Sequence, residues 1–266
     1  MKKSGTGFEF IFQVAALLVS ALLVHLVYVG VIRPGAASSL AEQAALLAAD
    51  PDHIVERSFY VVLRDYEQEI CIILMFWAFA IMGYKAVRLR RDRALLDRDL
   101  LQIEEGMRIL PEDTRDLSRQ LEALKPEERA SLLPRALLAA LHRFSAAPSV
   151  QDVAEASGSV CLSEGERLES ELAMIRYIAW AIPSVGFIGT VRGIGDALGQ
   201  AHRAVQGEIA GVTESLGTAF NSTLIALMIS LVLVFLMHQL QLVQERFVLD
   251  AQAYCEENLI RHLHTP

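Results

Sequence analysis

An uncharged apolar run near the N-terminus constrains this chain more than any other feature. Residues 10–32 contain no Asp, Glu, Lys or Arg, and a helix needs about 20 such residues to cross the hydrocarbon layer of a membrane. Three further apolar blocks follow at 70–87, 172–198 and 216–243. Because the 53% of hydrophobic residues is gathered into these blocks, the sequence predicts an all-α integral membrane protein with four transmembrane helices.

The first run is preceded by Lys2 and Lys3, as a secretory signal peptide would be. It is too long for the apolar core of a signal, however, and the residues before Pro34 make a poor cleavage site, so we interpret it as an uncleaved span. Cytoplasmic loops carry an excess of Lys and Arg. Basic residues stand before the first span and after the second, where they are Lys85, Arg88, Arg90, Arg91 and Arg93. This pattern predicts that both termini are cytoplasmic.

The spans divide the chain into six expected segments. They are the first transmembrane helix (1–35), a periplasmic helical arm (36–69), the second transmembrane helix (70–87), a cytoplasmic helical domain (88–170), the third and fourth transmembrane helices (171–243) and a cytoplasmic C-terminal helix (244–266). In the cytoplasmic domain an apolar stripe predicts a helix over 89–110, and a short apolar helix is expected over 131–144. Ser163 and Glu166 resemble a capping box that would begin a long helix running into the third span. The third and fourth spans are therefore expected to have long cytoplasmic extensions.

The charge balance and the cysteines exclude several function classes. A net charge of -8 argues against nucleic acid as a partner. Cys71, Cys161 and Cys255 have no spacing typical of a disulfide framework or a metal site. No nucleophile–base pair stands at membrane depth, so an intramembrane enzyme is disfavoured. We expect no metal, no cofactor and no enzymatic activity.

Two motifs carry the sharpest signal. The third span contains AIPSVGFIGTVRGIGD at 181–196, and the fourth contains GVTESLGTAFNSTL at 211–224. Together they resemble the signature of the MotA/TolQ/ExbB proton-channel family, in which a proline and small residues precede Gly-Thr-Val and then Gly-Ile. The matching residues are Pro183, Gly186, Gly189, Thr190, Val191, Gly193 and Ile194.

The small residues and the proline of the third span have physical interpretations of their own. Gly186, Gly189 and Gly193 share one helical face, which favours close approach of another helix; packing alone would account for them. Pro183 leaves the carbonyl near residue 179 without its helical donor. Such a carbonyl needs a partner or water in a membrane, so Pro183 predicts either a simple kink or a flexible, wet joint.

Hydroxyls within the third and fourth spans are the candidates for a proton pathway that lines a pore. A hydroxyl both donates and accepts, so a row of them can relay protons, although many bond only to their own helix backbone. The candidates are Thr190, Thr218, Ser222 and Thr223. Thr190 matches the family's lining threonine, whereas its counterpart in the fourth span stays open between Thr218 and Thr223.

Three charged residues lie near the predicted outer ends of these spans. Arg192 stands where the family usually has an apolar residue, and Asp196 follows one turn later, where it can pair with Arg192. Glu214 lies near the outer surface of the fourth span. We expect these residues to form an interfacial ion pair or a gate. His25 is interpreted as an interior or interfacial histidine rather than as a proton carrier.

The resemblance implies a ring subunit of a proton-driven motor in the bacterial cell inner membrane. It implies a homopentamer around a single-span protein of the MotB/TolR/ExbD type, itself a dimer, which supplies a membrane aspartate. No carboxylate lies in the middle of a predicted span here, as expected if the partner protein supplies the proton-binding carboxylate. The alternative is a membrane scaffold or passive channel with the same helix packing. The process driven, and the choice between proton and sodium, are not encoded in these motifs.

Overall fold

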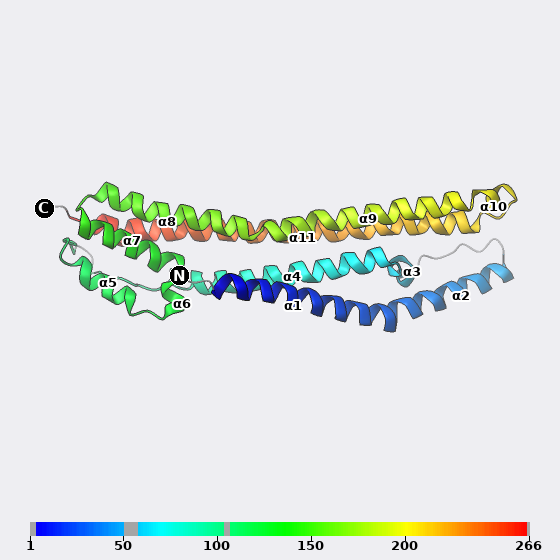
Figure 1. The fold of residues 1–266 in the computed structure, drawn as a ribbon, viewed down its shortest axis with the longest axis horizontal. Helices are drawn as coiled ribbons and strands as arrows, with labels where there is room; N and C mark the ends of the chain where they lie inside the picture. The colour runs from blue at the N-terminus through cyan, green and yellow to red at the C-terminus, as the bar shows by residue number, and fades with distance from the viewer. Residues whose placement is uncertain (1–3, 51–57, 104–106, 265–266) are drawn as a thin grey trace. The chain divides into compact units, whose positions relative to one another are not determined.

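The structure, a computed structural model, describes residues 4–50, 58–103 and 107–264. Lys2, Lys3 and the stretch 51–57 of the expected arm lie outside the described residues. The helices, shown in Figure 1, are α1 (Ser4–Val27), the π-helical turn η1 (Tyr28–Ile32), α2 (Arg33–Ala49), α3 (Phe59–Leu63), α4 (Tyr66–Arg93), α5 (Thr114–Glu122), α6 (Pro126–Arg129), α7 (Leu132–Ala146), α8 (Val150–Glu171), α9 (Ala173–Gly199), α10 (Ala201–Val205), α11 (Ala210–Asn258) and the 3-10 turn η2 (Ile260–His262).

Four helical stretches among the described residues are long and apolar enough to cross a membrane. They are Gly7–Ala49, Tyr66–Arg93, Val150–Gly199 and Ala210–His262. The predicted all-α class and the predicted number of spans are confirmed. The first stretch continues without a helix end at residue 35, where we had expected the span to give way to the arm.

A π-helical turn joins α1 to α2 because of Pro34. Proline has no backbone N–H to bond the carbonyl four residues earlier. The backbone adjusts one residue before it, where the N–H of Arg33 bonds to the carbonyl of Tyr28, five residues back. Such single π turns are a common way to absorb a break in the α-helical register, so the helix passes through the proline rather than ending there.

The chain divides into two compact units, which we describe separately. Unit 1 contains Met1–Gly83 and Met174–Met237, and unit 2 contains Tyr84–Ala173 and His238–Pro266. The predicted proton-pathway residues, the glycines and Arg192 all fall in unit 1, so unit 1 holds the candidate site.

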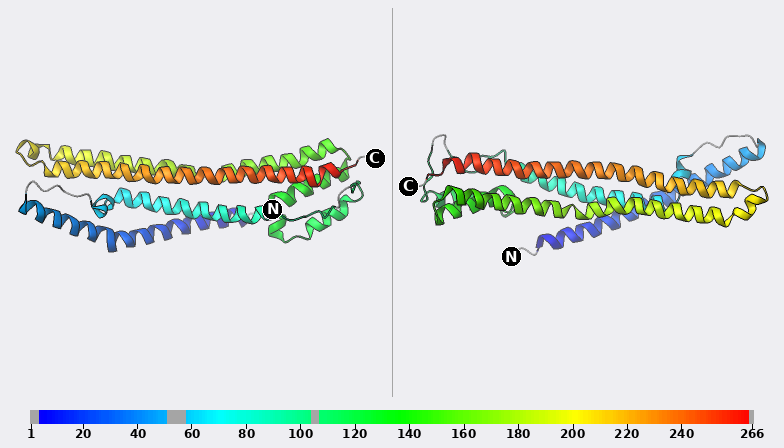
Figure 2. Two further views of the ribbon diagram at one scale, coloured as in Figure 1. Left: turned by 180° about the vertical axis from the view of Figure 1, so that it is seen from behind. Right: turned by 90° about the horizontal axis from the view of Figure 1, so that it is seen from above.

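Within unit 1, α9 and α11 run side by side, as the views in Figures 1 and 2 agree. The face of α11 toward α9 is built from small residues, among which Ala219 and Ala226 are fully buried and Ser222 nearly so. The three glycines of α9 are buried as well. A Cβ added at Gly186 would collide with the Cβ of Ala226. The missing side chains therefore let two helix backbones approach closely, which is how small residues stabilise helix pairs in membranes.

The other two glycines of this face show the same close approach. A Cβ at Gly189 would stand 2.5 Å from the Cβ of Ser222 and 3.1 Å from the Cγ of Glu67 on α4. A Cβ at Gly193 would stand 2.8 Å from the carbonyl oxygen of Ser215. These contacts lie within one chain, so the close helix approach that the glycine face predicts is made between helices of the same subunit.

The N-terminal half of unit 1 packs through side chains rather than through bare backbone. Trp77 of α4 donates its indole N–H to the carbonyl of Gln13 on α1, at 2.9 Å. Val24, Tyr28, Ile32 and Leu63 form a buried cluster. This cluster orders the α3–α4 junction that borders the candidate site.

Unit 2 has its own core, formed where α7 packs against α8. Leu133, Leu137, Leu141 and Phe144 of α7 are fully buried, and Arg135 pairs with Glu164 of α8 at 3.0 Å. The short apolar helix expected over 131–144 is thus observed as α7.

Two local predictions for unit 2 are wrong. The helix expected over 89–110 ends at Arg93, because the following backbone makes tertiary contacts instead: the N–H of Leu100 donates to the hydroxyl of Tyr254 at 3.0 Å. The capping box expected at Ser163 is not a helix start. Helix α8 begins at Val150 with Ser149 as its N-cap, accepting from the N–H of Asp152.

Replacing Gly193 by Ala should destabilise the helix pair, because the added methyl meets the backbone of α11. Overpacking of this kind costs about 1–3 kcal/mol. Gly195 on the same helix has open space at its Cβ position, so Gly195→Ala is the matched control and should be nearly neutral. The free energy of unfolding in detergent micelles measures both, and equal effects would contradict the packing.

Candidate functional site

A pair of hydroxyls lies at the centre of the α9–α11 contact. The hydroxyl of Thr190 is in hydrogen-bond contact with that of Thr223. Thr190 Oγ1 also lies 3.3 Å from the carbonyl oxygen of Gly186 and 3.2 Å from that of Ala219. Thr223 Oγ1 lies 3.3 Å from the same Gly186 carbonyl. Each hydroxyl has one proton to donate and several acceptors within reach, so the hydrogen bonds of the pair can rearrange without moving the helices.

The other two predicted hydroxyls form a second group on α11. Ser222 is 1% exposed, and its Oγ donates to the carbonyl of Thr218 at 3.0 Å within the same helix. Ser222 also occupies the space beside Gly189. Thr218 lines a cavity one turn away. Of the two candidates left open in the fourth span, Thr223 is the one in contact with Thr190.

The carbonyl freed by Pro183 has found a partner. Pro183 lies inside α9, so the carbonyl four residues earlier, that of Ala179, lacks its helical donor. Ser230 of α11 donates its hydroxyl to this oxygen at 3.1 Å. The sequence predicted the need for a partner but missed Ser230; a hydroxyl seven residues after Thr223, on nearly the same face of the helix, was the available signal.

Arg192 does not pair with Asp196, and this prediction is wrong for the described residues. The guanidinium of Arg192 donates to Glu67 Oε2 at 2.8 Å and lies 3.8 Å from Asp65 Oδ1. The start of α4 brings two carboxylates in front of Arg192, and the Glu67 side chain is only 10% exposed. A charge pair is screened less where it is shielded from water, so these partners displace the neighbour on α9.

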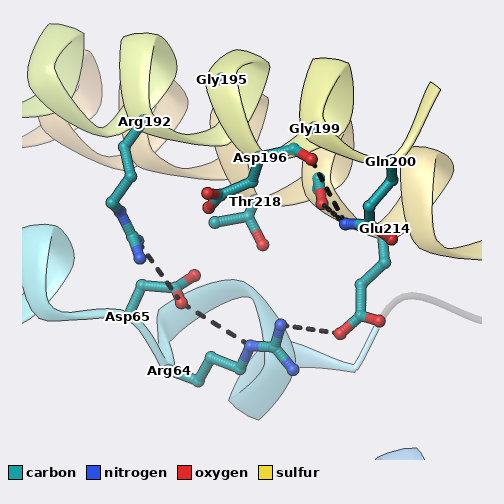
Figure 3. Close-up of a pocket in the computed structure, with 10 residues that line it drawn as sticks. Arg64, Asp65, Arg192, Gly195, Asp196, Gly199, Gln200, Glu214 and Thr218 are labelled. Carbon is teal, nitrogen blue, oxygen red and sulfur yellow. Dashed lines mark hydrogen bonds and ion pairs between the residues drawn. The ribbon is translucent and has the colours of Figure 1, made fainter. Parts of the chain in front are cut away.

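Asp65 and Arg64 extend this ion pair toward α11 (Figure 3). The guanidinium of Arg64 lies 3.7 Å from Asp65 Oδ1 and donates to Glu214 Oε1 at 2.9 Å. The network thus runs from Arg192 on α9 through the α3–α4 junction to Glu214 on α11. It borders a cavity of about 540 Å³ lined by Arg64, Asp65, Arg192, Gly195, Asp196, Gly199, Gln200, Glu214, Ser215 and Thr218.

A second carboxylate of α4 ties α1 and α2 to this region. Glu69 accepts from His25 Nδ1 at 2.7 Å and from Arg33 at 2.5 Å, and its side chain is nearly buried. His25 therefore contacts a nearly buried carboxylate, while its own side chain is 56% exposed.

The acidic residues of the α3–α4 junction are the site residues that sequence reasoning missed. Asp65, Glu67 and Glu69 are not among the site residues that the sequence motifs predict. The signal was their position, because carboxylates at the very start of an apolar span need cations as partners. Arg33 and Arg192 are such cations. Among the described residues no group of three His, Cys, Asp or Glu side chains is placed to hold a metal ion.

Asp65 lies just outside the predicted spans, and its environment shifts the pKa of its carboxyl. Burial raises the pKa of its carboxyl, and Arg64 and Arg192 oppose that shift by lowering it. Glu67 and Glu214 raise it further, and the net direction is upward. Asp65 therefore holds a proton at a higher pH than an exposed aspartate does.

Fold and site together define a multi-pass helical membrane protein with a hydroxyl pair between two closely packed spans. Residues 128–253 match the family described as the MotA/TolQ/ExbB proton channel family. This match agrees with the resemblance found in the sequence, and it covers the segment from α6 into α11. No curated protein and no solved structure matches the chain.

Ser230→Ala should destabilise the protein by about 1 kcal/mol, the usual net value of one hydrogen bond. The loss should shrink in a Pro183→Ala background, because residue 183 then regains an N–H for the Ala179 carbonyl. A double-mutant cycle on the free energy of unfolding measures this coupling. Strict additivity would show that Ser230 does not serve the carbonyl freed by the proline.

Arg192→Leu should cost about 1–3 kcal/mol, since it leaves the largely buried carboxylate of Glu67 without its donor, while the arginine itself is partly exposed. Combined with Glu67→Gln, the cost should fall, giving a coupling energy of about 0.5–3 kcal/mol. The matched control is Arg192→Leu with Asp196→Asn, for which the effects should add. The free energy of unfolding in detergent micelles is measured for all variants. A coupling energy with Asp196 instead of Glu67 would contradict the observed pairing.

Proposed function

We propose that this chain is the ring subunit of a proton-driven membrane motor, which couples proton flow to rotation of, or force on, a single-span partner. The observation that carries the proposal is the Thr190–Thr223 hydroxyl contact between α9 and α11. It lies between two helices long enough to cross a membrane, inside the segment that matches the proton-channel family.

The hydroxyl pair suits a site that passes protons to and from a partner's carboxylate. Thr190 and Thr223 share one acceptor, the Gly186 carbonyl, so either hydroxyl can turn its proton toward a new acceptor. In this mechanism the partner's membrane aspartate binds the proton, and the two hydroxyls stabilise its charged form after the proton leaves. Thr218 and Ser222 continue the polar path along α11.

The expected assembly is a homopentamer in the bacterial inner membrane around a dimeric MotB/TolR/ExbD-like protein. Both termini of the chain are cytoplasmic in this arrangement, and unit 2 extends into the cytoplasm. Large apolar side chains on α9 and α11 are exposed in the isolated chain, among them Phe187, Ile188, Phe220, Leu227 and Leu231. Lipid and neighbouring subunits would cover them, as a membrane ring requires.

The available energy is sufficient for stepwise motion. A membrane potential of 100 mV supplies about 2.3 kcal/mol per elementary charge. Thermal energy is about 0.6 kcal/mol, so one proton can bias one mechanical step.

Thr190→Val keeps the size of the side chain and removes its hydroxyl, so it tests the proposal directly. The hydroxyl of Thr223 then loses its contact with the Thr190 hydroxyl and keeps that with the Gly186 carbonyl, which should raise the barrier for proton transfer by about 1–3 kcal/mol and slow flux about 5- to 150-fold. Assembly with the partner should survive, and Thr190→Ser should keep part of the flux. The measurement is proton flux into vesicles that contain the chain with and without its single-span partner.

Thr213→Val is the matched control, because Thr213 on α11 donates only to the carbonyl of Ile209, directly before that helix, in the described contacts. It should leave flux unchanged. Unchanged flux in Thr190→Val would contradict the mechanism. Full flux through the isolated ring would favour the passive-channel alternative, since the coupling carboxylate is expected from the partner.

A further inference from the structure

The cavity at the α3–α4 junction is polar and large enough to hold water. Its volume is about 540 Å³, whereas one water occupies about 30 Å³ in the liquid. Two guanidinium groups, three carboxylates and a threonine hydroxyl border it. A cavity of this size with such a lining is hydrated, since each water finds several hydrogen-bonding partners.

Asp65 is the carboxylate on this cavity that lacks a full set of partners. Its Oδ1 lies between the guanidinium groups of Arg64 and Arg192, at 3.7 and 3.8 Å. Its Oδ2 is buried and has no hydrogen-bond partner among the described residues. A buried carboxylate oxygen without a partner is costly, and a bound proton removes that cost by neutralising the group.

We propose that Asp65 is a proton-binding site of this chain, which takes protons from the water of the cavity and passes them toward the Thr190–Thr223 pair. The inference rests on the proposed function and adds the residue that loads the pathway. In the loading step a hydronium ion in the cavity gives its proton to the Asp65 carboxylate, an O–H bond forms, and a neutral water remains. In the release step the O–H bond breaks, and the proton leaves to a water on the pathway side.

Charged groups from every neighbouring element face Asp65 and set its proton affinity. Arg64 and Arg192 favour the carboxylate, whereas Glu67 and Glu214 oppose it. Tyr28 of η1 lies close enough to interact with Asp65, and its buried hydroxyl has no partner among the described residues. Burial raises the pKa of Asp65 while the two guanidinium groups limit that rise, so the site binds protons readily and still releases them.

Thr218 connects the cavity to the hydroxyl pair. It lines the cavity, and its carbonyl accepts the hydroxyl of Ser222. The next residue along α11, Thr223, contacts Thr190. The distance along the helix from Thr218 to Thr223 is about 7.5 Å at 1.5 Å per residue, which a short chain of waters and hydroxyls spans.

The other carboxylates on the cavity are less suited to this role. The Glu214 side chain is more than half exposed and is paired with Arg64. Asp196 is exposed on α9 and is the matched control: it borders the same cavity, carries the same functional group and is not buried.

The test is infrared difference spectroscopy of the purified ring subunit in lipid vesicles over a pH series. A protonated buried carboxyl gives a carbonyl stretching band that ionised carboxylates lack. We expect one component of this band to belong to Asp65 and to titrate with a midpoint above about 3.9, the ordinary pKa of aspartate. Asp65→Asn should remove that component from the difference between wild-type and variant spectra, and Asp196→Asn should leave it in place. Spectra that Asp65→Asn leaves unchanged over the pH series, or a removed component that titrates at or below the ordinary value, overturn the proposal.

Asp65→Glu keeps the test decisive if the asparagine variant does not fold. It retains the carboxyl group, so the band should remain but shift in frequency or midpoint; an unchanged band assigns it to another residue and overturns the proposal. The spectroscopic result does not depend on motor activity. A normal Asp65 band together with wild-type flux in Thr190→Val would reject the proposed function and keep the proton site. No Asp65 band together with reduced flux in Thr190→Val would reject the proton site and keep the proposed function.

Discussion

The close approach of α9 and α11 is the interaction on which the rest of unit 1 depends. Three buried glycines on α9 face small residues on α11, and this brings side chains as short as serine and threonine into contact across the helix pair. With larger residues at the glycine positions, Thr190 could not reach Thr223, and Ser230 could not reach the Ala179 carbonyl. The packing geometry and the chemistry of the site therefore have one cause.

The membrane explains why polar groups within this packing are paired. Hydrocarbon offers no hydrogen bonds, so each backbone or side-chain polar group in a span needs a partner in the protein or a wet cavity. The Ala179 carbonyl is satisfied by Ser230, and the guanidinium of Arg192 is satisfied by Glu67. The Oδ2 atom of Asp65 departs from this rule, as do the Tyr28 hydroxyl and Gln68 Oε1, and Asp65 also lines a polar cavity of about 540 Å³.

The α3–α4 junction thereby acquires a role beside that of a connection between spans. Its carboxylates contact α9 through Arg192 and, through Arg64, reach Glu214 on α11. Glu67 also packs its aliphatic part beside Gly189. A proton that neutralises Asp65 would weaken the ion pairs of Asp65 with Arg64 and with Arg192. Because Arg192 belongs to α9 and Arg64 is paired with Glu214 on α11, the charge of Asp65 is physically coupled to the position of the α9–α11 pair.

The sequence by itself determined the helical class, the four spans and the family, because long uncharged apolar runs and the proline–glycine–threonine motif are local patterns. It also identified the glycine face, since helical periodicity assigns residues to faces. Only the tertiary structure decided the partners: Thr223 rather than Thr218 for Thr190, Ser230 for the carbonyl freed by Pro183, and Glu67 rather than Asp196 for Arg192. Those choices depend on distances between residues far apart in the chain, such as the 125 positions that separate Glu67 from Arg192. Periodicity within one helix carries no information about which residue of another helix lies opposite.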